Sequence, residues 1–268
     1  MIIRVLVTSV LSALVHARPP KGHLGIVPLP AEYTLGQTPI CLSPDFSITT
    51  NSLGGDLPED LWNAIIRTTE ALRRTQHTYL STEHGREHFP NEKCGAVLES
   101  LVLHYDVETD ESVVSIKEDA TRLVEDRVEL EGYTLDVPLG PEATLSSKSS
   151  LGLFRGLTTF QQLFYALPSV SGAQTRLKDT EAEYEFQEEV IYDTVDESVL
   201  NDQHLVSGQS PDIFAPSGPY HIEDKPTFGW RGVMLDTSRH FLSKETIKKQ
   251  LDVMAMVKLN VLHWYVPT

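Results

Sequence analysis

Residues 229–264 read GWRGVMLDTSRHFLSKETIKKQLDVMAMVKLNVLHW, and this stretch decides the fold of the C-terminal part of the chain. It opens with a continuous apolar run that ends at Asp236, which is typical of a buried strand. A helix follows that Ser243 can cap, and a second β-branched and aromatic run follows at residues 259–264. Strand, helix and strand in this order form a βαβ unit, which implies a parallel sheet.

The chain before this stretch has the pattern of a small α+β domain over residues 25–168. Helices are predicted where apolar residues recur every three or four positions, and strands where apolar and polar residues alternate. The predicted helices are residues 59–80 and 150–167, the second ended by Pro168, and the predicted strands are residues 27–50 (short and irregular), 100–107, 112–116 and 132–137. Strands followed by a packed helix favour the α+β class.

Residues 169–217 differ in composition from both flanking parts. They contain eleven Asp or Glu residues against two Lys or Arg residues, with Ser and Gly between them and few large apolar side chains. Such a stretch is typical of a solvated insertion or linker. An acidic binding loop is the alternative.

The chain has 268 residues and a formal net charge of −16. Nucleic acid and anionic membrane surfaces repel a protein of this charge, so we expect neither as a partner. A neutral substrate such as a sugar is not excluded.

The first residues, MIIRVLVTSVLSALVHARPP, place one arginine before an apolar run that ends in small residues at Val15 and Ala17. This pattern predicts a signal peptide over residues 1–17, and therefore a secreted, extracellular protein or one of the lysosome or vacuole. The alternative is a membrane anchor, but a run of about a dozen residues is shorter than the ~20 that span a bilayer.

The chain contains two cysteines, Cys41 and Cys94, and both follow the predicted signal peptide. In an oxidising compartment an even pair is expected to be bridged, so we predict a Cys41–Cys94 disulfide.

Four stretches resemble the secreted eukaryotic β-N-acetylhexosaminidases of glycoside hydrolase family 20. They are LGLFRGLTTFQQL, which is similar to the family's LRGLETFSQL; PYHIEDKPTFGWRG, similar to its domain-joining segment; GVMLDTSRHF, similar to LLDTSRH; and LDVMAMVKLNVLHW, similar to LDVMAYNKLNVFHW. The resemblance implies that residues 25–168 are the family's non-catalytic α+β domain and that a TIM (β/α)8 barrel opens near Phe228.

In such a barrel KLNVLHW would be the second of eight strands, so residues 228–268 would be the first βαβ unit of an incomplete barrel. The family continues HW with a His, two apolar residues and an Asp, whereas this chain has Thr268 at the position of the Asp. The expectation is a truncated or mis-spliced product whose last four residues are foreign.

By resemblance, the activity is hydrolysis of terminal β-linked N-acetylglucosamine or N-acetylgalactosamine with retention, in which the substrate's acetamido group is the nucleophile. The substrates would be glycan ends or chitin-type oligosaccharides. A homodimer is one possible assembly. The family's catalytic Asp-Glu pair would lie beyond residue 268, so no catalytic residue is assigned and the chain as given is expected to be inactive. One sugar-binding residue maps, Arg239, whose guanidinium could donate paired hydrogen bonds to sugar hydroxyls. The alternative is that Arg239 pairs with Asp236 or another carboxylate.

No metal or cofactor is expected. His240 and His263 are interpreted as hydrogen-bonded core residues of the barrel, without a catalytic role. HGREH at residues 84–88 fits the H-x-x-E-H zinc pattern, but Gly85 and Pro90 weaken the helix that such a site needs. An exposed loop is the preferred interpretation.

Two functional hypotheses remain. The first is enzyme identity as the product of a β-N-acetylhexosaminidase gene. The second is a non-catalytic fragment that acts at most as a binding or interaction module built on the α+β domain.

Overall fold

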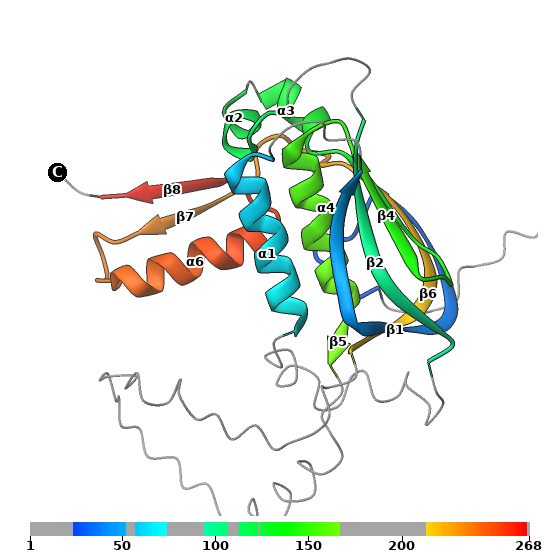
Figure 1. The fold of residues 1–268 in the computed structure, drawn as a ribbon. Coiled ribbons are helices and arrows are strands. Elements are labelled where there is room, and N and C mark those ends of the chain that lie inside the picture. Colours follow the sequence, from blue (N-terminus) through cyan, green and yellow to red (C-terminus); the bar gives the residue numbers. More distant parts are fainter. Residues whose placement is uncertain are drawn as a thin grey trace, which may run out of the picture.

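The computed structural model describes residues 24–51, 57–73, 94–106, 113–122, 124–166 and 213–266. Figure 1 shows two parts: a curved sheet with helices against it, and a strand–helix–strand unit that projects to one side. The elements are β1 (Glu32–Asn51), α1 (Glu59–Arg73), β2 (Ala96–Tyr105), α2 (Ile116–Thr121), α3 (Val124–Leu130), β3 (Tyr133–Val137), β4 (Glu142–Ser147), α4 (Ser150–Leu163), β5 (Tyr165–Ala166), β6 (Ile213–Asp224), β7 (Gly232–Asp236), α6 (Lys244–Met256) and β8 (Val261–Tyr265).

The larger sheet has six strands in the order β1-β2-β4-β3-β6-β5, and β1 also pairs with β6. The first half of β1 runs antiparallel to β6 and its second half runs parallel to β2. Residues 27–50 were predicted as short irregular strands, but one long strand forms from Glu32. Register shifts near Gly36, Pro39 and Pro44 absorb the residues that do not fit a regular ladder.

Helices α1 and α4 lie side by side against the sheet (Figure 1), and the core lies between them and the strands. Ser149 begins α4, because its hydroxyl accepts a 2.9 Å hydrogen bond from the Gly152 amide. Phe160 of α4 is fully buried and its ring lies 5.8 Å from that of Phe46. The largest fully buried side chains are Phe160, Phe214, Ile40, Leu61, Leu98, Leu101, Leu103, Leu135, Leu145, Leu153, Leu157 and Ile222.

The predicted strand at residues 112–116 was wrong, because residues 113–115 form no strand and α2 begins at Ile116. Ser115 caps this helix by accepting a hydrogen bond from the amide of Glu118, the third residue after the cap, which is the spacing of a capping box. The helix predicted to reach Pro168 ends at Leu163, and the next residues pair with β6 as β5. Strand β4 was not predicted.

Strand β6 extends the sheet beyond the α+β domain that the sequence predicted. It pairs with β1, β3 and β5, so the sheet takes a strand from beyond residue 168, where the predicted α+β domain ended. Residues 213–217, predicted as the end of the acidic insertion, belong to this strand. Local composition did not reveal it, because the pairing partner in β1 lies far earlier in the chain.

The structure contains the predicted disulfide, which joins Cys41 of β1 to Cys94 just before β2. The two Cα atoms lie 5.6 Å apart across 53 residues of sequence. The bridge therefore fixes the start of β2 beside its parallel neighbour β1, where Gly95 also donates a 2.9 Å hydrogen bond to the Pro39 carbonyl.

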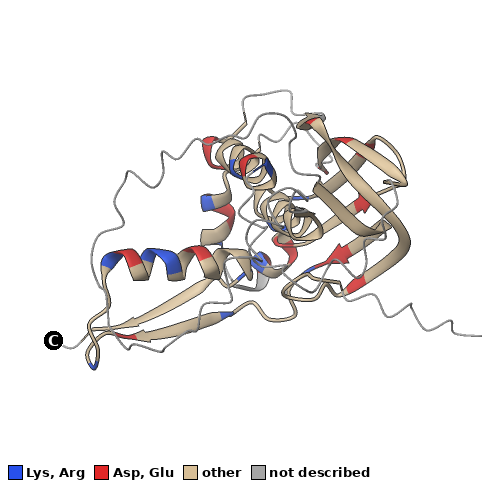
Figure 2. Ribbon diagram, turned by 90° about the horizontal axis from the view of Figure 1, so that it is seen from below, with Lys and Arg blue, Asp and Glu red and all other residues tan. Residues whose placement is uncertain are grey.

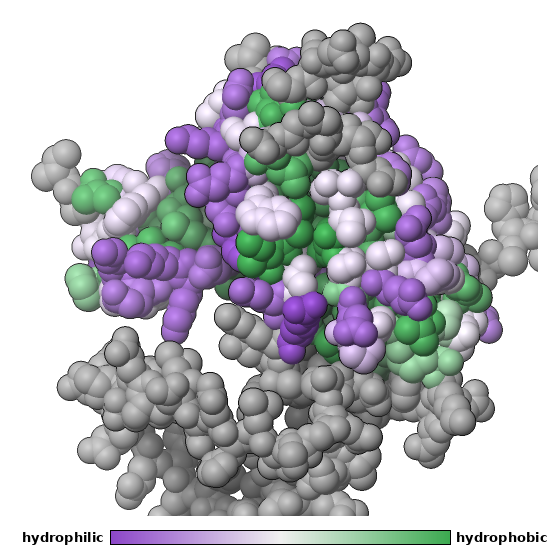
Figure 3. All heavy atoms as spheres, viewed as in Figure 1, coloured by the Kyte–Doolittle hydropathy of each residue, from purple (hydrophilic) through white to green (hydrophobic). Residues whose placement is uncertain are grey.

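Strands β7 and β8 pair in parallel and α6 connects them, as the sequence predicted. Ser243 caps α6 by accepting a hydrogen bond from the Thr246 amide. Acidic and basic residues follow one another along α6 in Figure 2, and Figure 3 shows hydrophilic side chains over its outward face. Of the segment 225–266, only Met254 and Lys258 are buried.

Several predictions fall on residues that the structure does not describe. They are the signal peptide, residues 74–80 of the first helix, the HGREH pattern and residues 169–212 of the acidic stretch. Among the helices that the structure does describe, none is long and apolar enough to cross a membrane.

Candidate functional site

The carboxyl end of β7 carries the predicted sugar-binding residue in a short turn. Asp236 is the last residue of the strand, and one oxygen of its carboxylate accepts hydrogen bonds from the amide and the hydroxyl of Ser238. The other oxygen lies 3.4 Å from Nε of Arg239. The turn therefore uses Asp236 to hold the chain that presents Arg239.

Strand β8 braces the same turn. The indole Nε1 of Trp264 donates a 2.9 Å hydrogen bond to the hydroxyl of Thr237, and the Thr237 amide donates to the carbonyl of Tyr265 at 3.3 Å. The carboxyl ends of the two parallel strands thus meet at one edge, which is where barrel enzymes place their binding residues.

Arg239 is exposed in this turn. Its side chain is 83% exposed, whereas that of Asp236 is 27% exposed. The sequence left two interpretations of Arg239, sugar binding or pairing with a carboxylate. The structure contains the pairing with Asp236. Water screens an exposed pair of this kind, so the pair holds the guanidinium only weakly. Sugar binding by Arg239 stays a prediction.

The hydrogen bonds from Ser238 lower the pKa of Asp236. A carboxyl group with a lowered pKa stays ionised at neutral pH and cannot act as a general acid there. The chemistry available at this edge is therefore hydrogen bonding and charge pairing.

The two histidines interpreted as core residues are exposed. His240 follows the turn and His263 lies on β8, so neither is the buried core residue that the sequence indicated. Within the described ranges, no three His, Cys, Asp or Glu side chains come together in a way that could hold a metal ion.

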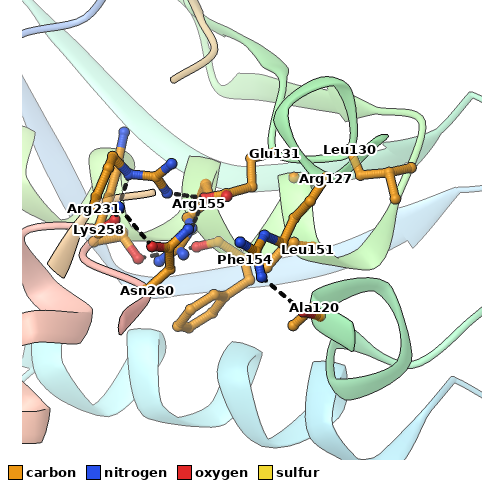
Figure 4. Close-up of polar contacts among 12 residues, drawn as sticks. Ala120, Arg127, Leu130, Glu131, Leu151, Phe154, Arg155, Arg231, Lys258 and Asn260 are labelled. Carbon is orange, nitrogen blue, oxygen red and sulfur yellow. Dashed lines mark hydrogen bonds and ion pairs between the residues drawn. The ribbon is translucent and has the colours of Figure 1, made fainter. Parts of the chain in front are cut away.

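A group of buried and partly buried charges lies at the opposite, amino-terminal ends of β7 and β8 (Figure 4). Glu131 is 2% exposed on its side chain, and one of its carboxylate oxygens contacts both Arg155 of α4, at 2.8 Å, and Arg231 just before β7. Lys258 donates to the carboxylate of Asp224, at 2.9 Å, and to the Tyr133 hydroxyl, at 2.8 Å. We call these six residues the buried junction: Tyr133, Glu131, Arg155, Asp224, Arg231 and Lys258.

Burial shifts the pKa values of the junction. It lowers the pKa of Lys258 and of Arg155, in each case against the opposing attraction of the carboxylate beside it, Asp224 or Glu131. It also raises the pKa of Tyr133, which stays protonated. The charged pairs are therefore desolvated, and each ion depends on its partner.

Sequence reasoning missed the junction because its members are far apart in the chain. Glu131 and Arg231 are 100 residues apart, and Tyr133 and Lys258 are 125 residues apart. The available signal was indirect: Arg231 and Lys258 lie inside the stretches that resemble the family, without a role assigned there.

Two family models match the chain. "Glycosyl hydrolase family 20, catalytic domain" matches residues 228–267, which include the β7-α6-β8 unit, and "beta-acetyl hexosaminidase like" matches residues 26–163. The second match alone spans about half of the chain.

Curated relatives agree with these matches. The chain is 27% identical to beta-hexosaminidase 1 of Arabidopsis thaliana over 268 residues, which is 96% of this chain and 38% of that protein. It is 30% identical to the beta-hexosaminidase subunit beta of Sus scrofa over 247 residues, which is 91% of this chain and 34% of that one. The chain thus spans little more than a third of the length of these relatives.

A solved structure, the chitobiase of Flavobacterium johnsoniae, aligns with a TM-score of 0.48 at 22% identity, over 90% of this chain and 27% of that one. On the two family matches and these relatives, the chain belongs to glycoside hydrolase family 20, the family of the beta-hexosaminidases.

Proposed function

We propose that this chain is the N-terminal part of a β-N-acetylhexosaminidase, an enzyme that removes terminal β-linked N-acetylglucosamine or N-acetylgalactosamine from glycans or chitin-type oligosaccharides. The observation that carries the proposal is the catalytic-domain match at residues 228–267, a segment that folds as a parallel strand–helix–strand unit. Such units repeat around a TIM barrel, so residues 228–268 would open that barrel, and residues 25–168 together with β6 would form the non-catalytic α+β domain.

Arg239 would hold the substrate. It follows the carboxyl end of β7. Its pair with Asp236 is exposed, so little free energy is lost when the guanidinium leaves Asp236 and binds sugar hydroxyls. The planar guanidinium can donate two hydrogen bonds to neighbouring oxygens, which fixes the orientation of a ring. Asp236 would hold the turn rather than donate a proton.

The chain of 268 residues would not itself hydrolyse substrate. The retaining, substrate-assisted reaction needs an acid that protonates the leaving oxygen and a carboxylate that orients the acetamido group. The family's Asp-Glu pair that supplies them has no assigned counterpart in this sequence. A non-catalytic binding or interaction module built on the α+β domain is the second candidate, and the observation that favours it is that the six-stranded sheet, its helices and the disulfide share a core of their own.

The remaining expectations belong to the same proposal. A signal peptide over residues 1–17 would direct the protein to the outside of the cell, or to a lysosome or vacuole, where the disulfide is stable. Neither nucleic acid nor a membrane would be a partner, and the assembly could be a homodimer.

The test begins with the transcript. Sequencing beyond the codon for Trp264 is expected to reveal an open frame that encodes an Asp-Glu pair, and its longer product should cleave an aryl N-acetyl-β-glucosaminide. In that product, Arg239→Lys should lower kcat/KM about 10–100-fold, because a hydrogen-bonded charged donor contributes about 1.5–3 kcal/mol.

Arg122→Lys, an exposed arginine of the α+β part, is the matched control and should leave kcat/KM unchanged. A longer product without turnover would contradict the proposed activity. Equal kcat/KM for Arg239→Lys and the control would contradict the role of Arg239 alone. For the 268-residue chain, turnover in the usual range of about 1–1000 per second would contradict its predicted inactivity.

A further inference from the structure

The two parts of the structure meet through charges of opposite sign. The carboxylates of Glu131 and Asp224 belong to the α+β part: Glu131 directly follows α3, and Asp224 ends β6. The cations of Arg231 and Lys258 belong to the β7-α6-β8 unit, before its first strand and before its second. Each cation contacts one of the two carboxylates.

Arg231 also ties the two strands to each other at their amino-terminal ends. Its amide donates to the side chain of Asn260 at 2.9 Å, and its carbonyl accepts from the amides of Asn260 and Val261 at 2.8 and 3.1 Å. Its Nε donates to the Lys258 carbonyl at 3.0 Å, and a terminal nitrogen reaches Glu131. One side chain thus connects both strands of the unit to the α+β part.

Lys258 makes the second connection. It adopts a positive φ of 58°, an uncommon conformation for a residue with a side chain, and this places its ammonium 2.9 Å from Asp224. The hydroxyl of Tyr133, which accepts from the same ammonium, is also bonded to Thr159 at 2.6 Å. The carboxyl end of α6 receives one further contact, because Gln162 of α4 donates to the Met256 carbonyl at 2.8 Å.

The β7-α6-β8 unit buries few apolar side chains where it contacts the α+β part. Only Met254 and Lys258 are buried in residues 225–266, and the large apolar side chains Phe228, Trp230, Met234, Phe241 and Trp264 are about half exposed or more. Hydrophobic contacts have no preferred direction, whereas a guanidinium–carboxylate pair fixes distance and angle. The placement of the unit therefore depends on the ion pairs.

We propose that the α+β part is a docking platform for the β7-α6-β8 unit, and that the pairs Arg231–Glu131 and Lys258–Asp224 set the position of the unit on it. This inference does not rest on the proposed enzymatic activity. It assigns the α+β part a role within the chain: it orders a strand–helix–strand unit that buries little of its own surface.

Hydrogen exchange of the full 268-residue chain, followed by mass spectrometry, tests the proposal. Arg231→Met is the main variant, because Glu131 keeps Arg155 as its partner and the α+β part should stay folded. Amides of β7 and β8 should exchange about 100-fold faster than in the unmodified chain, since a broken buried pair is strongly destabilising to the element that it holds. Amides of β2 and β4 should be unchanged.

Glu131→Gln removes the carboxylate from the platform side and should also accelerate exchange in β7 and β8. Because it leaves the buried Arg155 of α4 without its partner, the rates of β2 and β4 are judged from Arg231→Met alone. The matched control is Glu129→Gln, which breaks the nearby pair with Lys225, whose side chains are 70% and 57% exposed, and should change no rate. The proposal is wrong if Arg231→Met leaves β7 and β8 within threefold of the unmodified chain. It is also wrong if Arg231→Met accelerates β2 and β4 as much as β7 and β8.

Discussion

Replacing Gly152 by alanine should destabilise the α+β part, because α4 begins in close contact with neighbouring segments at this position. A Cβ atom on Gly152 would lie 2.1 Å from the hydroxyl oxygen of Ser147, 2.4 Å from the carbonyl oxygen of Gly132 and 2.9 Å from that of Leu130. Two of these three atoms belong to the backbone, so a rotamer change cannot relieve the clash.

The net effect follows from two opposing contributions. Overpacking of a tight interior costs about 1–3 kcal/mol, and the backbone contacts place this site at about 3 kcal/mol. Alanine is favoured over glycine inside a helix by about 1 kcal/mol. The expected loss in the free energy of unfolding is therefore about 2 kcal/mol.

Urea denaturation followed by circular dichroism measures this loss. Gly140→Ala is the control, because its nearest neighbour would be Pro138 at 4.0 Å, and it should stay within about 0.5 kcal/mol of the unmodified chain. Gly156→Ala should be destabilised less than Gly152→Ala, since its contacts at 2.2 and 2.9 Å are with the two methyl carbons of Leu145, and this side chain can shift its rotamer where a backbone carbonyl cannot. Equal stability of Gly152→Ala and Gly140→Ala would refute the packing argument.

Three further predictions concern the same part. Tyr133→Phe removes a buried hydroxyl that is bonded to three side chains, and it should lower the free energy of unfolding by about 1–3 kcal/mol, whereas the exposed Tyr265→Phe should be neutral in the same urea titration. Burial raises the pKa of Asp119, so as the pH rises the carboxyl group loses its proton in the unfolded state before it does so in the folded state. The free energy of unfolding should therefore fall as the pH rises above about 3.8. Asp119→Asn should remove this contribution when denaturation is measured at several pH values. Reduction of Cys41–Cys94 should cost about 4 kcal/mol in the chain-entropy estimate, and two alkylatable thiols in the native protein would contradict the bridge.

The elements that sequence reasoning predicted have strong local signals. The apolar stripe of α4 recurs every three or four residues, and the β7-α6-β8 unit combines apolar strands with a capped helix. The disulfide followed from the presence of two cysteines behind a predicted signal peptide. In each case the decisive information lies within a short window or in a simple count.

The elements that it missed depend on pairing across the chain. Strand β4, EATLSS, has little apolar character and forms because β2 and β3 flank it. Strand β6 contains two prolines and a glycine, which argue against a central strand on local grounds. The candidate site shows the same division: Arg239 was located through a contiguous motif, whereas Glu131 and Arg231 become neighbours only in the folded chain.

The position of β6 has a consequence for how the protein is made and how it responds to cleavage. Because β6 lies between β3 and β5 and also pairs with β1, the ribosome must deliver residues up to 224 before the sheet can close. A protease that cuts between residues 166 and 213 would release no independent domain. The two pieces would stay associated through β6, as a nicked protein that separates only when it is denatured.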